Sequence, residues 1–218
     1  MIEPTVKRAT VFIDGQNLFF AAKEAFGHSY PNYDVIELSR KLCIAKGWQL
    51  QKVRFYTGVP EAKHDPKWNG LWMRKFSYMG RQGIEVISRP LRYHHHRVIC
   101  PDAKPFVFQS GEEKGIDVRI AVDVIRLAHQ KAYDVALLFS QDQDLAEVAE
   151  EIRVIASEQD RLIKIVSAYP VSAKTKNSRG VNRTDWLRID QVLYDACLDP
   201  VDFRKSSPEE EEPSAYWY

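Results

Sequence analysis

Acidic residues stand directly behind two apolar runs of the chain, in positions where carboxylates could bind a metal ion. The run TVFID ends at Asp14, and Asp142 and Asp144 follow the run VALLFSQ with one residue between them. A third run, GIDVRIAVDVIRLA, carries Asp117 near its start. Carboxylates that gather at one place repel one another and have raised pKa values unless a cation compensates them. Mg²⁺ or Mn²⁺ suits such a group, because these ions prefer hard oxygen ligands and keep waters for chemistry.

Each of these acids taken singly has a simpler explanation as a helix cap. Ser140 and Gln143 have the spacing of a capping box, and Asp142 and Asp144 would also be favoured at a helix N-terminus. Four acids in three separate segments are harder to explain in that way. We therefore expect Asp142 and Asp144 to serve chiefly a cation.

Strands and helices alternate along most of the chain, which predicts an α/β fold with a central, mainly parallel sheet and helices on both faces. The five expected strands are residues 10–14, 53–58, 84–88, 135–139 and 162–168. The expected helices are residues 16–26, 35–45, 67–80, 116–130, 145–157 and 186–197. Such sheets bind ligands at the carboxyl ends of their strands, so Asp14 and Asp142 are expected at one edge of one sheet.

Two helical faces are expected to be structural. Asp123 lies six residues after Asp117, on another face of the same helix, where it would make a structural contact or face solvent. Trp68, Trp72 and Phe76 share one face of the expected helix 67–80. Core packing is favoured for this aromatic stripe over a platform on which bases stack.

Residues 89–109 interrupt the alternation, and their β-forming residues around a Pro-Asp pair predict a hairpin insertion. Three consecutive histidines lie within it. Since neighbouring strand residues point to opposite faces, only His94 and His96 could share a zinc ion, and no second pair of ligands supports this. A polar hairpin face is the favoured interpretation, and contact of Arg92 and Arg97 with RNA phosphates is the alternative.

The segments VFIDGQNLFF, KGIDVRIAVDVIRLA and YDVALLFSQDQDL, in this order, resemble the NYN domain family of PIN-like nucleases. The resemblance covers roughly residues 9–168. It implies a PIN-like, Rossmann-like three-layer sandwich, with the central five-stranded sheet and the hairpin insertion expected above. It also implies carboxylate-bound Mg²⁺ or Mn²⁺ and hydrolysis of RNA phosphodiester bonds, with single-stranded or loop regions of RNA as the partner.

The resemblance assigns roles residue by residue. Asp14, Asp117 and Asp142 would be metal ligands and catalytic residues, with Asp144 as a fourth acid. Asn17 matches the family Asn that supports the first Asp and contacts substrate. Lys114 matches the Lys of the Lys-Gly pair before the second acid, and Ser140 opens the third motif; both are expected to bind substrate. One position departs from the family, because Gln141 stands where a Gly is usual and where backbone would approach a phosphate.

Residues 170–182 form an expected polar loop within the clearest cluster of basic residues. Its cations could be a solvated surface, or they could bind the phosphate backbone with an affinity that falls as salt rises. The four expected to bind RNA are Lys174, Lys176, Arg179 and Arg183.

Length and composition indicate one domain, residues 1–200, and an acidic tail, residues 201–218. The net charge is +1, but four Glu lie in the final 12 residues, so residues 1–206 carry 31 basic and 26 acidic side chains. The tail is either solvated or a mimic of nucleic acid. Three isolated cysteines, no secretory signal and no membrane-spanning stretch predict a cytoplasmic protein without membrane attachment. The sequence does not specify an oligomeric state.

Two other functions compete with the ribonuclease. A glycosyltransferase can also hold a metal with Asp-x-Asp after a strand, but Asp14 and Asp117 would then have no explanation. The stronger alternative is a catalytically silent RNA-binding or adaptor protein that keeps the NYN fold.

Overall fold

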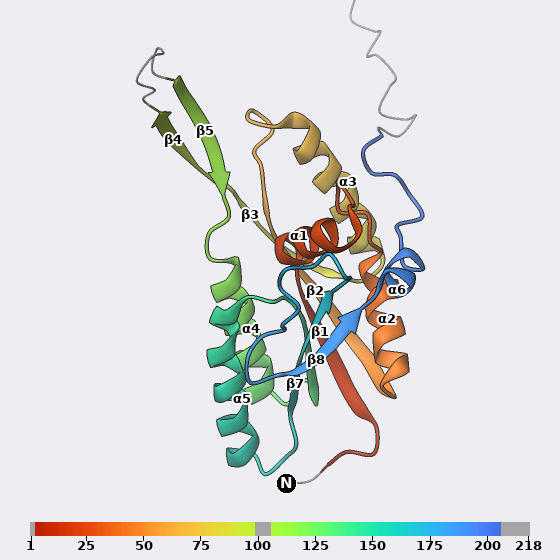
Figure 1. Ribbon diagram of the computed structural model, residues 1–218. Helices are drawn as coiled ribbons and strands as arrows, with labels where there is room; N and C mark the ends of the chain where they lie inside the picture. The colour runs from red at the N-terminus through yellow and green to blue at the C-terminus, as the bar shows by residue number, and fades with distance from the viewer. Residues whose placement is uncertain (1–2, 99–105, 206–218) are drawn as a thin grey trace, which may run out of the picture.

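The computed structural model describes residues 3–98 and 106–205, which build around one parallel sheet of six strands (Figure 1). The strand order is β3-β2-β1-β6-β7-β8, and every neighbouring pair in it is parallel. The strands are β1 (Lys7–Asp14), β2 (Trp48–Val59), β3 (Glu85–Pro90), β6 (Val135–Phe139), β7 (Lys164–Pro170) and β8 (Asp185–Ile189). The α/β class and the mainly parallel sheet are confirmed.

The expectation of five strands was wrong by one, because β8 occupies part of the predicted helix 186–197. The strand pairs with β7 from Asp185 to Ile189, and only then does the short helix α6 (Gln191–Asp195) begin. Asp190 accepts a hydrogen bond from the Leu193 amide at 2.8 Å and so sets the start of that helix. Pairing at the sheet edge therefore overrides the local helical pattern.

Helices cover both faces of the sheet, as Figure 1 shows. Side chains alternate along β1, so that Val11 and Ile13 enter one core while Phe12 enters the other. The first core packs against α1 (Gly15–Phe26), α2 (Val35–Ala45), α3 (Pro66–Arg81) and α6. The second packs against α4 (Ile116–His129) and α5 (Ala146–Glu158). No described helix is long and apolar enough to cross a membrane.

Both structural expectations for helical faces are confirmed. In α3, Trp72 belongs to the first core, and Trp68 and Phe76 pack against it, although Trp68 is only partly buried and keeps a surface towards solvent. Asp123 is fully buried and is held by a network of hydrogen bonds rather than facing solvent. Its donors are the Arg54, Arg119 and Arg126 guanidiniums and the Tyr56 hydroxyl, at 2.9–3.1 Å.

The predicted insertion is an antiparallel hairpin of β4 (Arg92–Val98) and β5 (Phe106–Glu112) that projects from the body of the molecule (Figure 1). It extends three residues beyond the expected end at position 109. The expected Pro-Asp turn falls within residues 99–105, which lie outside the described residues. Most of the acidic tail, residues 206–218, also lies outside them.

Candidate active site

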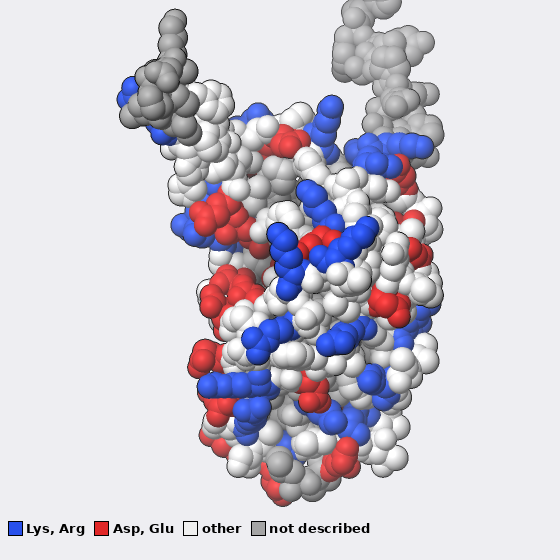
Figure 2. All heavy atoms as spheres, viewed as in Figure 1, with Lys and Arg blue, Asp and Glu red and all other residues white. Residues whose placement is uncertain are grey.

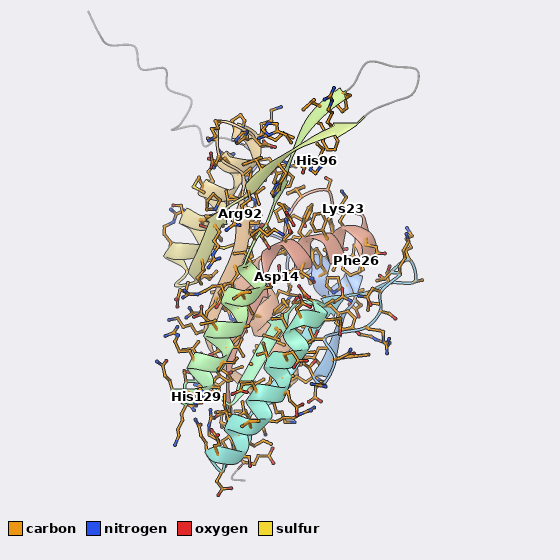
Figure 3. All side chains as sticks on the ribbon, turned by 90° about the vertical axis from the view of Figure 1, so that its left-hand side faces the viewer. Asp14, Lys23, Phe26, Arg92, His96 and His129 are labelled. Atoms are coloured by element: carbon orange, nitrogen blue, oxygen red, sulfur yellow. The ribbon has the colours of Figure 1, made fainter. Side chains whose placement is uncertain are left out.

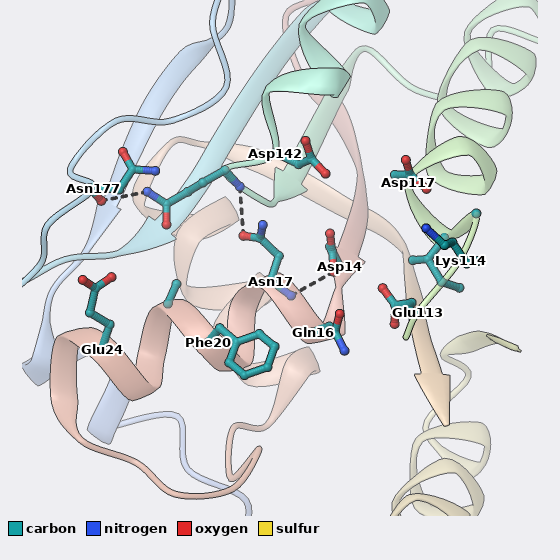
Figure 4. A pocket seen from close by; sticks show the side chains of 14 residues that line it. Asp14, Gln16, Asn17, Phe20, Glu24, Glu113, Lys114, Asp117, Asp142 and Asn177 are labelled. Atoms are coloured by element: carbon teal, nitrogen blue, oxygen red, sulfur yellow. Dashed lines mark hydrogen bonds between the residues drawn. The ribbon is translucent and has the colours of Figure 1, made fainter. Parts of the chain in front are cut away.

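The carboxyl ends of β1 and β6 meet at one edge of the sheet, where a pocket of about 510 Å³ opens between α1 and the start of α4. Five carboxylates line it, from three separate parts of the chain, and Glu24 on α1 is the one of them farther along that helix (Figure 4). We call this the acidic pocket, after Asp14, Glu113, Asp117 and Asp142. Asn17 and Lys114 also line it. Three of the expected metal ligands therefore lie around one cavity, as the strand ends require.

Asp14 is the most buried of these acids, with 6% of its surface exposed. It is the N-cap of α1, because its Oδ1 accepts from the Asn17 amide at 2.9 Å. The Ser140 hydroxyl donates to Oδ2 at 3.4 Å. Burial, together with the like charges of Asp142 and Asp117, raises the pKa of Asp14 to about 6. The negative form is thus unfavourable without a compensating cation.

Asn17 joins the first and third motifs. Its Oδ1 accepts from the Gln141 backbone N–H at 3.0 Å, while its own N–H is bound to Asp14 (Figure 4). This holds Asn17 between the two carboxylate-bearing segments, with its backbone on Asp14 and its side chain on Gln141, and its contact with substrate stays a prediction.

The third motif is a short cap as well as a wall of the pocket. Asp142 is the N-cap of a 3-10 turn, η1 (Gln143–Leu145), and its Oδ1 accepts from the Asp144 amide at 3.0 Å. The Ser140 hydroxyl accepts from the Asp142 amide at 3.1 Å, so Ser140 is held inside the motif. Asp144 is exposed and does not line the acidic pocket. The structure therefore brings together Asp14, Asp117 and Asp142, but not Asp144.

The capping box between Ser140 and Gln143, which was the alternative to a cation site, does not form. The Gln143 side chain instead donates to the Gly180 carbonyl at 3.1 Å and accepts from the Asn182 amide at 3.1 Å. It therefore binds the segment that follows β7.

The second motif begins α4 with a glycine that the geometry requires. Gly115 has φ of +71°, and a Cβ there would lie 2.6 Å from the Arg89 guanidinium. Asp117 follows in the first turn of α4. The Lys114 ammonium pairs with Glu112 at 2.6 Å at the rim of the pocket.

Glu113 is a pocket residue that the sequence analysis missed. Its carboxylate accepts a hydrogen bond from the Gly58 amide. Burial raises the pKa of Glu113 to about 7, with further contributions from Asp14 and Asp117. The only signal in the sequence is its place directly before Lys114, and adjacent acids in a polar run are ordinarily solvated.

The basic segment, residues 174–183, reaches the pocket through two backbone carbonyls that bind the Gln141 side chain and through Asn177. Gln141 Nε2 donates to the Asn177 and Arg179 carbonyls at 3.0 and 2.8 Å, and Asn177 lines the pocket (Figure 4). The charged side chains of Lys174, Lys176 and Arg179 are exposed. On the face shown in Figure 2, Lys and Arg form several separate groups with acids between them.

Arg183 faces another neighbour. Its guanidinium lies 3.7 Å from both Glu147 and Glu150 on α5. None of the four expected cations of this segment lines the acidic pocket, so their contact with RNA stays a prediction.

The hairpin cations lie farther away. Figure 3 shows Arg92 nearer to Asp14 than His96, which lies farther out along the hairpin. Arg92 and Arg97 are exposed and do not line the acidic pocket. His94 lies 3.4 Å from Glu112, and His96 bonds the Ser110 hydroxyl at 2.7 Å, so both contribute to the polar face that was favoured.

The acidic pocket suits Mg²⁺ or Mn²⁺, because the ligands that it offers are carboxylate oxygens and its described lining contains no His or Cys. In residues 3–98 and 106–205, however, no three His, Cys, Asp or Glu side chains are grouped closely enough to hold an ion as they stand. The pocket thus has the ligand types for such an ion, without a closed ligand set.

The fold and the pocket define an α/β protein with carboxylates at the carboxyl edge of a parallel sheet. The model of the NYN domain matches residues 8–178, and the chain belongs to the NYN domain family. This confirms the family to which the three motifs pointed. None of the curated proteins matches the chain.

Solved structures add support for the fold. A protein of unknown function from Vibrio parahaemolyticus is similar with a TM-score of 0.51 and 19% identity, over 88% of this chain and 98% of that one. MurG from Acinetobacter baumannii aligns with a TM-score of 0.32 and 11% identity, over 84% of this chain and 45% of that one. The first likeness concerns the fold alone, and the second is too weak to carry an argument.

Proposed function

We propose that the chain is a metal-dependent ribonuclease that hydrolyses RNA phosphodiester bonds at the acidic pocket. The observation that carries this proposal is the meeting of Asp14, Asp117 and Asp142, from three separate motifs, around one cavity. Family membership supports the reaction class, because the resemblance to PIN-like nucleases implies this chemistry.

Asp14, Asp117 and Asp142 would hold Mg²⁺ or Mn²⁺, with some carboxylates reaching the ion through its retained waters. When bound, such an ion activates a water as nucleophile and stabilises the charge that develops on the phosphate. Lys114, at the rim, would bind a phosphate oxygen once RNA competes with Glu112 for its ammonium. Glu113, with a pKa of about 7, is suited to accept a proton near neutral pH.

The decisive experiment incubates the purified protein with labelled RNA and DNA, with Mn²⁺, with Mg²⁺ or with EDTA. We expect RNA cleavage that needs the metal and that is lost in Asp142→Asn. Equal cleavage in EDTA would end the metal mechanism, and preferential cleavage of DNA would end the assignment to RNA.

A silent RNA-binding protein is the second candidate, and one observation favours it. The described carboxylates do not form a closed ligand set, which is what a protein that binds RNA elsewhere on its surface, without an ion in the pocket, would show. A protein that binds RNA with unchanged affinity in EDTA and cleaves nothing with Mn²⁺ would support this function.

We also propose that the protein acts in the cytoplasm. Cys43 and Cys197 are free and buried, which is compatible with a reducing compartment. Fractionation of cells that express the tagged protein would test this.

A further inference from the structure

Three adjoining hollows, of which the acidic pocket is the first, extend across α1 to the start of α3. The second hollow, of about 250 Å³, shares Gln16 and Phe20 with the acidic pocket. The third, of about 630 Å³, shares Trp68 with the second. Neighbouring hollows thus have side chains in common, and we call the three together the path.

The chemistry of the lining changes along the path. The acidic pocket is followed by a mainly apolar hollow, whose walls include Phe19, Phe20, Trp68 and Leu91. The third hollow combines aromatic rings with cations. It is lined by Tyr30, Trp68, Lys67, Arg74 and Arg204.

Aromatic rings form a nearly continuous row between the ends of the path. The ring centroids of Phe20 and Phe19 are 5.4 Å apart, and those of Phe19 and Trp68 are 6.0 Å apart. Phe20 is 54% exposed, and Figure 4 shows its ring on α1 beside the acidic pocket. A single exposed ring would be ordinary. Here the exposed ring is the wall between a carboxylate cavity and an apolar one.

Two of the three cations of the third hollow are held in place by hydrogen bonds. The Arg204 guanidinium lies 3.9 Å from the centre of the Tyr30 ring and donates twice to Asp202. Arg74 donates to the Phe203 carbonyl at 2.9 and 3.0 Å. Lys67 is exposed in the first turn of α3. Three cations therefore line the end of the path away from the acidic pocket, and Arg204 is paired there with Asp202.

We propose that single-stranded RNA follows this path, with bases against Phe20 and Trp68 and a phosphate at Lys67 and Arg204. The inference rests on the proposed ribonuclease function, because the acidic pocket would receive the bond that is cut. Aromatic side chains with interleaved cations bind single strands without sequence preference. Paired bases cannot enter such hollows, so the path selects unpaired RNA.

Binding of labelled oligouridylates tests the path without cleavage, in the Asp142→Asn background with Mn²⁺. We expect oligomers of about eight nucleotides to bind more tightly than oligomers of about three, because only the longer ones reach the third hollow. Phe20→Ser and Lys67→Glu should each reduce this advantage by roughly fivefold or more, through lost stacking and lost phosphate contact. Both side chains are exposed at least in part, so neither change opens the core.

Matched control changes lie on or beside α2, away from all three hollows. Ile44→Ser removes a side chain that is 69% exposed, and Lys46→Glu makes the same change of net charge as Lys67→Glu. We expect both controls to keep the preference for longer RNA.

The outcomes separate the path from the proposed function. If the unsubstituted protein neither binds nor cleaves RNA, the ribonuclease and the path both fail. If it cleaves RNA but the advantage of longer oligomers survives in Phe20→Ser and Lys67→Glu, only the path is overturned. Equally tight binding of a duplex, or displacement of the RNA by a glutamate-rich peptide, would also overturn it, the latter in favour of an acidic protein segment.

Discussion

The Gln141 backbone N–H donates to Asn17 Oδ1 at 3.0 Å, and this bond ties the loop after β6 to the first turn of α1. The Gln141 side chain points the other way, to the carbonyls of Asn177 and Arg179. The residue that replaces the family glycine therefore lines the acidic pocket, and its amide is held there by two backbone carbonyls. Where a glycine would leave the backbone accessible, Gln141 adds a side-chain contact with the basic segment.

Replacing Gln141 should loosen that segment. Gln141→Ala removes two side-chain hydrogen bonds of about 1 kcal/mol each, so local opening near Asn177 should rise roughly tenfold or more. Trypsin cleavage after Lys174, Lys176 and Arg179 measures this opening. Gln159→Ala, which removes a similar bond to the His129 carbonyl, is the control and should leave those cleavage rates unchanged. Equal rates in Gln141→Ala and wild type would show that the glutamine does not hold the segment.

Metal-linked stability should depend on Asp142 and not on Asp144. Asn caps a helical turn about as well as Asp, so Asp142→Asn should keep its melting temperature without metal. An ion at 100 times its dissociation constant stabilises the wild type by about 2.7 kcal/mol, and Asp142→Asn should lose most of that. Thermal melts with and without Mn²⁺ measure both effects. Asp144→Asn, at an exposed site outside the pocket, should respond to Mn²⁺ as wild type does; equal loss in both variants would restore Asp144 to the site.

The pKa of Glu113 predicts a pH-dependent cost in the metal-free protein. Because burial raises this pKa from 4.5 to about 7, the folded state binds more protons than the unfolded state between those values. Wild type should therefore lose stability relative to Glu113→Gln as pH rises through that window. With allowance for solvent screening, the difference above pH 7 should be on the order of 1 kcal/mol. Urea unfolding of both proteins at several pH values measures it, and a constant difference would contradict the shift.

Asp123 should be the most sensitive of the structural acids. Asp123→Ala removes the buried carboxylate from Arg54, which keeps Glu85 as its acidic partner, and should cost about 3 kcal/mol. Burial opposes ionisation, but the hydrogen bonds from Arg119 and Arg126 hold the pKa of Asp123 below 3.8. The native contribution of its charge is thus present above pH 3.8 and is lost as pH falls through the lower folded value.

Urea unfolding at neutral and acid pH would measure both the cost and its loss. Glu151→Ala, at an exposed site on α5, is the control and should change stability by less than about 0.5 kcal/mol. A similar loss in both variants would show that the network around Asp123 adds nothing.

The sequence predicted the sheet and the three acidic segments because their signals are local. Asp14 directly ends an apolar strand, and the alternation of strands and helices places Asp142 at the same edge. Glu113 was missed because its burial depends on Gly58, which lies 55 residues away and is brought near only by the fold. Strand β8 was missed for a similar reason, since its partner β7 and not its own residues makes Asp185–Ile189 extended.

The place of β1 in the sheet bears on how the chain folds during synthesis. β1 lies between β2 and β6 in the sheet, and β6 follows β1 in the sequence by about 120 residues. At about 5–20 residues per second, the ribosome needs roughly 6–25 s to deliver β6 after β1. During that time one edge of a strand that is buried from Ala9 to Asp14 in the folded protein has no partner and is open to pairing with other chains. Chaperone contact with the nascent chain is therefore expected to concentrate on the interval before Val135–Phe139 emerges.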